Sequence, residues 1–384
     1  MKVYFDNAAT TPLHPKVFDT MKKYLTENFG NPSSTHSFGR SARVIIEETR
    51  ELIASFINAN PSEIYFTSGG TESNNFIISG VAQSNFFESN RKAIITSKAE
   101  HNCVSNSCKE LERNGYKVEW LEVNGSTKID INDINKNISD YTSLISLIHV
   151  NNETGSINPI KEIGKLFNDK NLFFHTDAVQ SFGKYKLDMN ELNIDCLSAS
   201  AHKINGPKGI GFAYVKSGTP IKSLILGGPQ ERNRRGGTEN VAGIAGFAEA
   251  LRYAQENLAG NFNHVTYLKK TLVEGIKSLS NNSIHINGGE LSSPYILSIT
   301  FLSDYYNNDA EAMLMFLDIN GIAASNGAAC TSGTWKPSQV ILNSGYNEKD
   351  AQGTIRFSFG IQNTIDEVEY TLEVINKMII KFRK

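Results

Sequence analysis

The chain has 384 residues, of which 40% are hydrophobic and 20% are charged, a composition typical of a globular protein with a large core. The formal net charge of −2 and the lack of clustered Lys and Arg argue against a nucleic-acid partner. The apolar runs are too short to span a membrane, no secretory signal opens the chain, and four cysteines do not make a disulfide framework, so we expect a cytoplasmic protein without a membrane partner.

Short β-rich runs alternate with helical patterns over more than half of the chain. Several runs are almost continuously apolar, as in strands that are covered on both faces. Helical crossovers between strands predict an α/β fold with a mostly parallel sheet, and a tighter connection before residue 211 allows one antiparallel hairpin. The expected strands are Ile64–Thr67, Ala93–Ser97, Val118–Val123, Leu144–Val150, Leu172–Asp177, Cys196–Ala199 and Gly211–Val215, and the expected helices are Glu72–Ser84, Val104–Asn114 and Ile160–Lys170.

The pattern changes after about Thr238, where long helices become more frequent than strands. This part of the chain predicts a smaller α+β unit, and the first long helix is a natural boundary between the two units. The expected helices are Val241–Leu258, Val265–Leu279, Asp309–Asn320 and one from Asp366, and the expected strands are Ile296–Phe301 and Gly353–Phe359.

Polar or glycine-rich segments follow four of the expected strands. In an open α/β sheet, ligands bind beyond the carboxyl ends of the strands. The four segments should therefore meet at one crevice. They are Ser68-Gly-Gly-Thr, Asn151-Asn-Glu-Thr-Gly, Asp177 with Gln180, and Ser200-Ala-His-Lys.

The segment from Thr67 to Thr71 joins a strand to a helix through two glycines. Exposed N–H groups at the start of a helix bind anions, most often phosphate. The segment lacks the spacing of a nucleoside-triphosphate loop or of a dinucleotide-binding turn. Taken alone, it also fits a plain turn with a threonine cap.

Three further side chains could carry chemistry in this crevice. A buried carboxylate at Asp177 needs a cationic partner, which a pyridinium nitrogen would supply, although it could also cap the next helix. Lys203 could form a Schiff base if burial lowers its pKa, or it could be a surface lysine. His101 could stack on an aromatic ring and move protons, or it could be structural.

Cys330 lies among small residues, in Ser325-Asn-Gly-Ala-Ala-Cys-Thr-Ser-Gly-Thr. Such a segment predicts an exposed, mobile loop, because it neither packs a core nor favours a helix. A cysteine there is either incidental or a nucleophile.

Together these motifs resemble the cysteine desulfurases of the NifS/IscS type, which are class V aminotransferases with the aspartate-aminotransferase-like fold (fold type I). The resemblance covers essentially the whole chain, and eight motifs occur in the order of the family. They are Tyr4-Phe-Asp-Asn-Ala-Ala-Thr-Thr, Gly30-Asn-Pro-Ser-Ser-Thr-His, Thr67-Ser-Gly-Gly-Thr-Glu-Ser-Asn-Asn, Asn151-Asn-Glu-Thr-Gly, His175-Thr-Asp-Ala-Val-Gln, Ser200-Ala-His-Lys, Gly227-Gly-Pro-Gln-Glu-Arg with Arg235-Gly-Gly-Thr, and Ala329-Cys-Thr-Ser-Gly.

The resemblance implies pyridoxal 5'-phosphate as the cofactor, L-cysteine as the substrate, and a role for each matching residue. Lys203 would hold the cofactor through an imine, Asp177 would pair with the ring nitrogen, Gln180 would hydrogen-bond the phenolic oxygen, and His101 would stack on the ring. The phosphate would be bound by Gly70, Thr71, Ser200 and His202, and by Thr238 of the other subunit of a homodimer. Asn152 and Arg356 would hold the substrate carboxylate.

In this family the substrate sulfur passes to an enzyme cysteine as a persulfide and alanine leaves, which gives the Cys330 loop its role. A separate acceptor protein would then take the sulfur, for iron–sulfur cluster assembly or for tRNA thiolation. The resemblance also implies a large cofactor-binding domain, 16–255, and a small domain formed by 1–15 and 256–384.

Three other functions remain open at this point. A selenocysteine lyase would share the cofactor and most contacts. An aminotransferase of the same fold would need a keto acid and no Cys330. A scaffold that only binds a sulfur carrier would not need Lys203, Asp177, His101 and Cys330 together.

Overall fold

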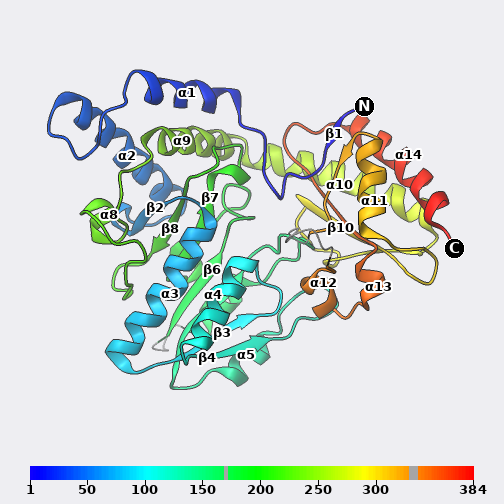
Figure 1. Ribbon diagram of the computed structural model, residues 1–384, viewed down its shortest axis with the longest axis horizontal. Helices are drawn as coiled ribbons and strands as arrows, with labels where there is room; N and C mark the ends of the chain where they lie inside the picture. The colour runs from blue at the N-terminus through cyan, green and yellow to red at the C-terminus, as the bar shows by residue number, and fades with distance from the viewer. Residues whose placement is uncertain (168–171, 328–335) are drawn as a thin grey trace.

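The computed structural model describes residues 1–167, 172–327 and 336–384 (Figure 1). A seven-stranded sheet runs through the larger part of the described chain, with the strand order β2-β8-β7-β6-β5-β3-β4. Neighbouring strands pair in parallel from β4 to β7, whereas β8 is antiparallel to both β7 and β2. The strands are β2 (Ile64–Thr67), β3 (Ala93–Ser97), β4 (Lys117–Leu121), β5 (Thr142–Ile148), β6 (Phe173–Asp177), β7 (Cys196–Ser200) and β8 (Gly211–Val215).

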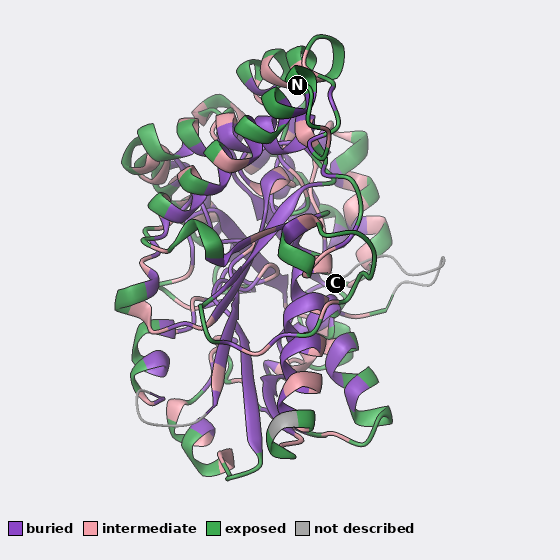
Figure 2. Cartoon of the chain, turned by 90° about the vertical axis from the view of Figure 1, so that its left-hand side faces the viewer, coloured by how far each residue is buried: buried purple, intermediate pink, exposed green. Residues whose placement is uncertain are grey.

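This sheet is buried on both faces because neighbouring residues of its strands pack into different clusters. Ile94 of β3 packs against helices α3 and α4, while Ile95 packs into the cluster formed with α2 and α9. Such alternation follows from the two-residue period of a strand, and Figure 2 shows the strands buried between layers of helices. The helices of this part are α1 (Pro15–Thr26), α2 (Ser37–Phe56), α3 (Gly70–Ser89), α4 (Asn102–Arg113), α5 (Ile131–Asn137), α6 (Ile160–Lys165), α7 (Met189–Leu192), α8 (Gln230–Asn233) and α9 (Val241–Glu256), with the 3₁₀ turns η1 (Pro61–Glu63) and η2 (Ala201–Lys203).

The rest of the described chain forms a second core around a small antiparallel sheet, in the order β12-β10-β9. Side chains from α10, α11 and α14 pack into this core together with Val3, Phe5 and Ala8 from the start of the chain. The division into domains at residues 15 and 255 remains a prediction. The elements are β1 (Val3–Tyr4), α10 (Leu258–Ser280), β9 (Ile284–Ile286), β10 (Ile296–Phe301), α11 (Ala310–Ile319), β11 (Ile322–Ala323), α12 (Gln339–Asn343), α13 (Glu348–Ala351), β12 (Thr354–Ser358) and α14 (Ile365–Phe382).

The start of the chain contacts strand β11 and the end of strand β12. Strand β1 pairs with β11, and the side chain of Asn7 donates to the carbonyl oxygen of Ser358 at 2.9 Å. The backbone N–H of Ala8 donates to the hydroxyl of the same serine at 2.8 Å. These contacts hold the N-terminal segment between the two sheets (Figure 1).

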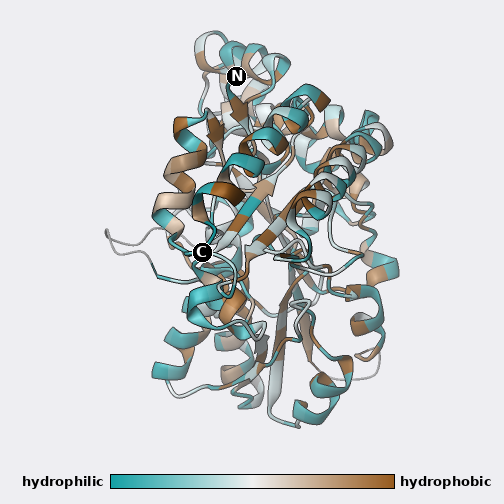
Figure 3. Ribbon diagram, turned by 90° about the vertical axis from the view of Figure 1, so that its right-hand side faces the viewer, coloured by the Kyte–Doolittle hydropathy of each residue, from teal (hydrophilic) through white to brown (hydrophobic). Residues whose placement is uncertain are grey.

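No described helix is long and apolar enough to cross a membrane. The helices instead mix hydrophilic and hydrophobic residues along their length, as Figure 3 shows.

A buried ion pair holds a strained segment within α8. Three consecutive residues, Glu231, Arg232 and Asn233, have φ values of 44°, 55° and 63°. Residues other than glycine rarely adopt this backbone conformation. The Glu231 carboxylate accepts two hydrogen bonds from the Arg50 guanidinium, at 2.8 and 2.9 Å, and one from the N–H of Phe66. Because these contacts offset the strain, we infer that the pair fixes the segment.

We expect Glu231→Ala to lower the free energy of unfolding by about 3 kcal/mol or more, since it leaves the buried Arg50 without its buried counter-charge. Glu47 is a matched control because it also contacts Arg50, at 3.0 Å, but its side chain is 36% exposed. Glu47→Ala should lower the free energy of unfolding by less than about 1 kcal/mol. Thermal unfolding midpoints measured at one protein concentration test this, and equal shifts for the two variants would contradict it.

Candidate active site

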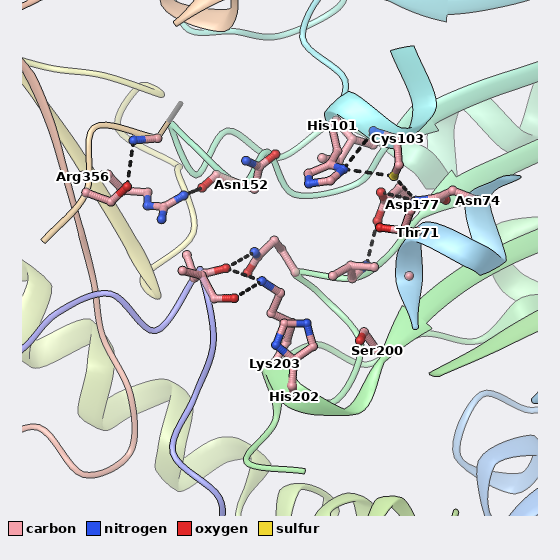
Figure 4. Close-up of a pocket in the computed structure, with 18 residues that line it drawn as sticks. Thr71, Asn74, His101, Cys103, Asn152, Asp177, Ser200, His202, Lys203 and Arg356 are labelled. Carbon is pink, nitrogen blue, oxygen red and sulfur yellow. Dashed lines mark hydrogen bonds between the residues drawn. The ribbon is translucent and has the colours of Figure 1, made fainter. Parts of the chain in front are cut away.

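A cavity of about 370 Å³ lies beyond the carboxyl ends of the parallel strands (Figure 4). Side chains that follow β2, β3, β5, β6 and β7 meet there with side chains from β12 and from the start of the chain. Ten of the residues to which the sequence analysis assigned roles line it: Gly70, Thr71, His101, Asn152, Asp177, Gln180, Ser200, His202, Lys203 and Arg356.

Lys203 follows β7 in the 3₁₀ turn η2, and its amine points toward the N-terminal segment. The Nζ atom donates to the carbonyl oxygens of Ala8 and Ala9, at 2.5 and 2.7 Å. Burial, together with the positive charge of Arg356, lowers the pKa of this amine to about 8. A substantial fraction is therefore neutral and nucleophilic near physiological pH.

Asp177 is the last residue of β6, and only 3% of it is exposed. Its Oδ1 accepts from the N–H of Val179 at 2.9 Å, and its Oδ2 accepts from the Asn74 amide at 2.7 Å. A carboxylate held in this way at a cavity wall is suited to pair with a cationic nitrogen.

The cavity adjoins a second, more open hollow of about 350 Å³ at the start of α3. Gly69 has a φ of 149°, which only glycine adopts readily, and this turn starts the helix at Gly70. The first N–H groups of a helix have no partner within the helix, so they can bind an anion. Ser200, His202 and Lys208 line the same hollow.

His202 contributes a neutral side chain to this hollow. Burial and the nearby Lys203, Lys208 and Lys184 lower its pKa to about 4. Its Nδ1 lies 3.1 Å from the Thr10 hydroxyl. The positive charge near the start of α3 therefore comes from lysine and from the helix itself rather than from this histidine.

Arg356 lies on β12 at the other end of the cavity, where 5% of it is exposed. One Nη donates to the Asn152 carbonyl oxygen and the other to the Asp6 carboxylate, both at 2.8 Å. Its Nε is buried without a hydrogen-bond partner among the described residues. The guanidinium thus retains a donor for a further carboxylate.

His101 is the N-cap residue of α4, and its ring is exposed to the cavity. Burial among protein atoms and the charge of Lys203 lower its pKa, while Asp177 opposes that change. The ring can therefore lie against a bound aromatic group as a neutral imidazole.

Gln180 provides a test of whether a polar ring fits the cavity. Its Nε2 donates to the Ala8 carbonyl oxygen at 2.9 Å and keeps a second N–H. Its Oε1 is buried and has no partner among the described residues. A buried amide left partly unsatisfied by the protein is expected where a ligand completes its hydrogen bonds.

Of the two remaining residues with roles predicted from the sequence, only Thr238 belongs to the described chain, and it does not line this cavity. Thr238 lines a separate hollow with Ser68, Gly209 and Arg235. Cys330 lies outside the described residues. The described chain before it reaches the cavity wall at Ser325 and Gly327.

Several cavity residues were not assigned roles in the sequence analysis. Asn74 and Cys103 line the cavity beside Asp177 and His101. Asn74 belongs to the quoted Thr67–Asn75 motif, so its polarity was a usable signal. The carbonyl groups of Ala8 and Ala9 gave no signal, because any residue could supply them.

The family model described as "Aminotransferase class-V" matches residues 3–371. A "Cysteine desulfurase IscS" from Clostridium botulinum (strain Hall) is 41% identical over 384 residues, which are 100% of this chain and 96% of that protein. The chain belongs to the class-V aminotransferase family. Enzymes of this family generally depend on pyridoxal phosphate.

Solved structures agree with this assignment. The class-V aminotransferase fold of the chain matches a "NIFS-LIKE PROTEIN" with a TM-score of 0.91 and 36% identity, covering 100% of both chains. A structure titled "SspA in complex with cysteine" matches with a TM-score of 0.83 and 34% identity, covering 94% of this chain and 100% of that one. The predicted fold, that of fold type I enzymes with a mostly parallel large sheet, is confirmed.

Proposed function

We propose that this class-V aminotransferase is a pyridoxal-phosphate-dependent cysteine desulfurase. It converts L-cysteine to L-alanine and keeps the sulfur as a persulfide on Cys330, from which an acceptor protein takes it. One observation carries the proposal: an amine of lowered pKa at Lys203, a buried carboxylate at Asp177 and an arginine with a free donor at Arg356 line the same cavity. The relatives named as cysteine desulfurases support the choice of reaction.

The residues at this cavity fit the cofactor. The amine of Lys203 would hold it covalently, Asp177 would face its ring nitrogen, and His101 would lie against the ring. The free N–H of Gln180 would reach the phenolic oxygen. The start of α3 at Gly70 and Thr71, with Ser200 and His202, would bind the phosphate.

Arg356 and Asn152 would hold the carboxylate of the substrate. Arg356 is already oriented by the Asn152 carbonyl oxygen and by Asp6, so little ordering is needed when a carboxylate binds to its Nε.

Lys203 would carry out the proton transfer of the reaction, and Cys330 would carry out the sulfur transfer. When bound, pyridoxal phosphate supplies an electron sink conjugated to the substrate nitrogen. Lys203, released as a neutral amine, takes the Cα proton of cysteine. The Cys330 thiolate attacks the substrate sulfur, so that the C–S bond breaks, an S–S bond forms on Cys330, and the carbon product takes up protons and leaves as alanine.

A homodimer would complete the phosphate site. Thr238 belongs to a loop beside the open hollow, and the exposed residues Leu224, Ile225 and Leu226 precede it, with Leu226 83% exposed. A second copy of the chain would cover these apolar side chains and bring its own Thr238 to the phosphate.

The reaction is tested by adding L-cysteine to the protein reconstituted with pyridoxal phosphate. We expect alanine to form, and we expect mass spectrometry to find one added sulfur, removable by a thiol reductant, on the peptide that contains Cys330. A protein that forms no alanine and no adduct would refute the proposal. Amino transfer to a keto acid without an adduct would identify an aminotransferase instead.

The rate of cofactor attachment should depend on pH in a way set by Lys203. Because only the neutral amine attacks an aldehyde, a pKa of about 8 predicts a rate constant that rises roughly fivefold from pH 7 to pH 8 and levels off above about pH 9. Stopped-flow absorbance with cofactor-free protein measures this. If Lys203 had an ordinary lysine pKa, the rate constant would still rise above pH 9. That result would contradict the prediction.

Arg356→Gln provides a control for this assignment. The positive charge of Arg356 is one cause of the lowered pKa of Lys203. Removing this charge should therefore move the midpoint of the pH profile for cofactor attachment to higher pH.

A further inference from the structure

The backbone N–H and the Sγ atom of Cys103 both lie close to one nitrogen of His101. The backbone N–H of Cys103 lies 3.2 Å from Nδ1 of His101, and its Sγ lies 2.9 Å from the same atom. A backbone N–H can only donate, so Nδ1 must present its lone pair. A neutral imidazole then carries its proton on Nε2.

The role of His101 as a helix cap agrees with this assignment. Helices α1 and α2 are also capped by histidines, His14 and His36, whose Nδ1 atoms accept from backbone N–H groups at 3.3 Å. His101 caps α4 in the same way. Cys103 adds a thiol to this arrangement that the other two caps do not have.

The hydrogen bonds of the Asn74 amide determine the direction in which the Cys103 thiol donates; Figure 4 shows Asn74 beside Asp177 and Cys103. The amide of Asn74 donates to Oδ2 of Asp177 at 2.7 Å and to Sγ of Cys103 at 3.1 Å. Because a carboxylate accepts hydrogen bonds, Asp177 determines which end of the amide faces it. Sγ therefore accepts a hydrogen bond from Asn74, and the thiol hydrogen of Cys103 is free to point at Nδ1 of His101.

Ser198 fixes the other end of the Asn74 amide, because its hydroxyl donates to Oδ1. Asn74 is fully buried and Cys103 is 9% exposed, so water does not compete for the hydrogen bonds that Asn74 makes with Ser198, Asp177 and Cys103. Burial also raises the pKa of the Cys103 thiol to about 12, which keeps its proton in place at neutral pH. The chain of bonds thus has one direction, from Asn74 through Cys103 to His101.

We infer that Cys103 and Asn74 are positioning residues that hold His101 with its proton on Nε2, so that His101 donates toward the cavity and Lys203, rather than His101, accepts the substrate proton. This inference rests on the proposed function for the substrate proton, but the state of His101 is a property of the chain itself. No described residue forms a hydrogen bond with Nε2, and the ring is open to the cavity.

The test is nitrogen-15 NMR of the imidazole groups in protein labelled at its histidines, with and without pyridoxal phosphate. The chain has 8 histidines, and the signals of His101 are those lost in His101→Gln. We expect a neutral ring at pH 7.5 with Nε2 protonated and Nδ1 bare. A proton found on Nδ1 would overturn the inference.

Two variants isolate the contribution of the thiol. Cys103→Ala removes the side-chain donor and keeps the backbone donor, so the ratio of the two neutral forms should move toward the Nδ1-protonated form by about fivefold, the effect of one ordinary hydrogen bond. Cys103→Ser keeps a donor and should resemble the wild type. An alanine variant that is folded, by its thermal midpoint, and has an unchanged ratio would refute the role of Cys103.

Failure of the inference about His101 can be distinguished from failure of the proposed function. The NMR measurement needs neither cysteine nor sulfur release. A protein with the expected ring state that forms no alanine from cysteine would refute the desulfurase and leave the positioning of His101 standing.

Discussion

Replacing Lys203 with alanine is expected to reduce cysteine turnover by about 10⁴-fold or more. The change removes the amine that holds the cofactor and takes the Cα proton, and general acid–base catalysis alone contributes up to about 10⁴-fold. The loss should appear in kcat, because Arg356 and Asn152 still bind the substrate carboxylate. Steady-state alanine formation measures the effect.

A matched variant separates the charge of Lys203 from its chemistry. Lys203→Arg keeps a cation in the same place, but a guanidinium stays protonated and cannot accept a proton. It should therefore be as inactive as the alanine variant. Small primary amines should partly restore turnover to Lys203→Ala, and full activity in either variant would exclude Lys203 as the acceptor of the proton.

With a thiol reductant present to release the persulfide sulfur, Cys330→Ser should reduce sulfide release by at least about 10³-fold, since loss of an enzyme's nucleophile can cost up to about 10⁶-fold in kcat. A hydroxyl cannot carry sulfur as a persulfide, whereas cofactor and substrate binding do not depend on the thiol. The variant should therefore keep the absorbance of bound cofactor and its response to cysteine. Titration with cysteine followed by absorbance, together with a sulfide assay, separates the two effects.

The other cysteines provide the control for this experiment. Cys103, Cys108 and Cys196 are all buried. Burial raises the thiol pKa of Cys108 to about 12 and that of Cys196 well above its ordinary value, so neither supplies a thiolate at neutral pH. Cys108→Ala should retain the persulfide on Cys330. An adduct found instead on one of the buried cysteines would contradict the assignment.

The large sheet could be predicted from the sequence because its strands are short apolar runs separated by helices. β2, β3, β8 and β10 have the predicted bounds, and the antiparallel pairing of β7 with β8 confirms the expected hairpin. Strand boundaries that differ do so by one or two residues, as for β5, because the ends of strands are set by tertiary contacts. Some helix boundaries were wrong by more: for example, α3 continues to Ser89 instead of Ser84, and α10 begins at Leu258 instead of Val265.

Helices α1 and α2 were not predicted, although α2 contains 20 residues. Both begin after a histidine that caps the helix, His14 and His36. The sequence signal for a helix start relies on Ser, Thr, Asp or Asn, so a histidine cap is easily overlooked. The short helices α12 and α13 carry too few residues to show a periodic pattern.

The residues at strand ends could be predicted as a group because the topology of a parallel sheet brings its carboxyl ends together. The hydrogen bonds that orient these residues could not be predicted from the sequence. Asn74 meets Asp177 across 103 residues of sequence, and the carbonyl oxygen of Ala8 meets Lys203 across 195 residues. Such pairings depend on the folded chain and leave no local pattern.

The N-terminal segment has a consequence for the order in which the protein matures during synthesis. The carbonyl groups of Ala8 and Ala9, which accept hydrogen bonds from the Lys203 amine, belong to a segment that hydrogen-bonds to Arg356 and Ser358, about 350 residues later in the chain. The large sheet can form while translation continues, since domains fold as their residues become available. The finished pocket must wait until β12 has been synthesised, so a nascent chain that lacks β12 is poorly equipped to capture the cofactor.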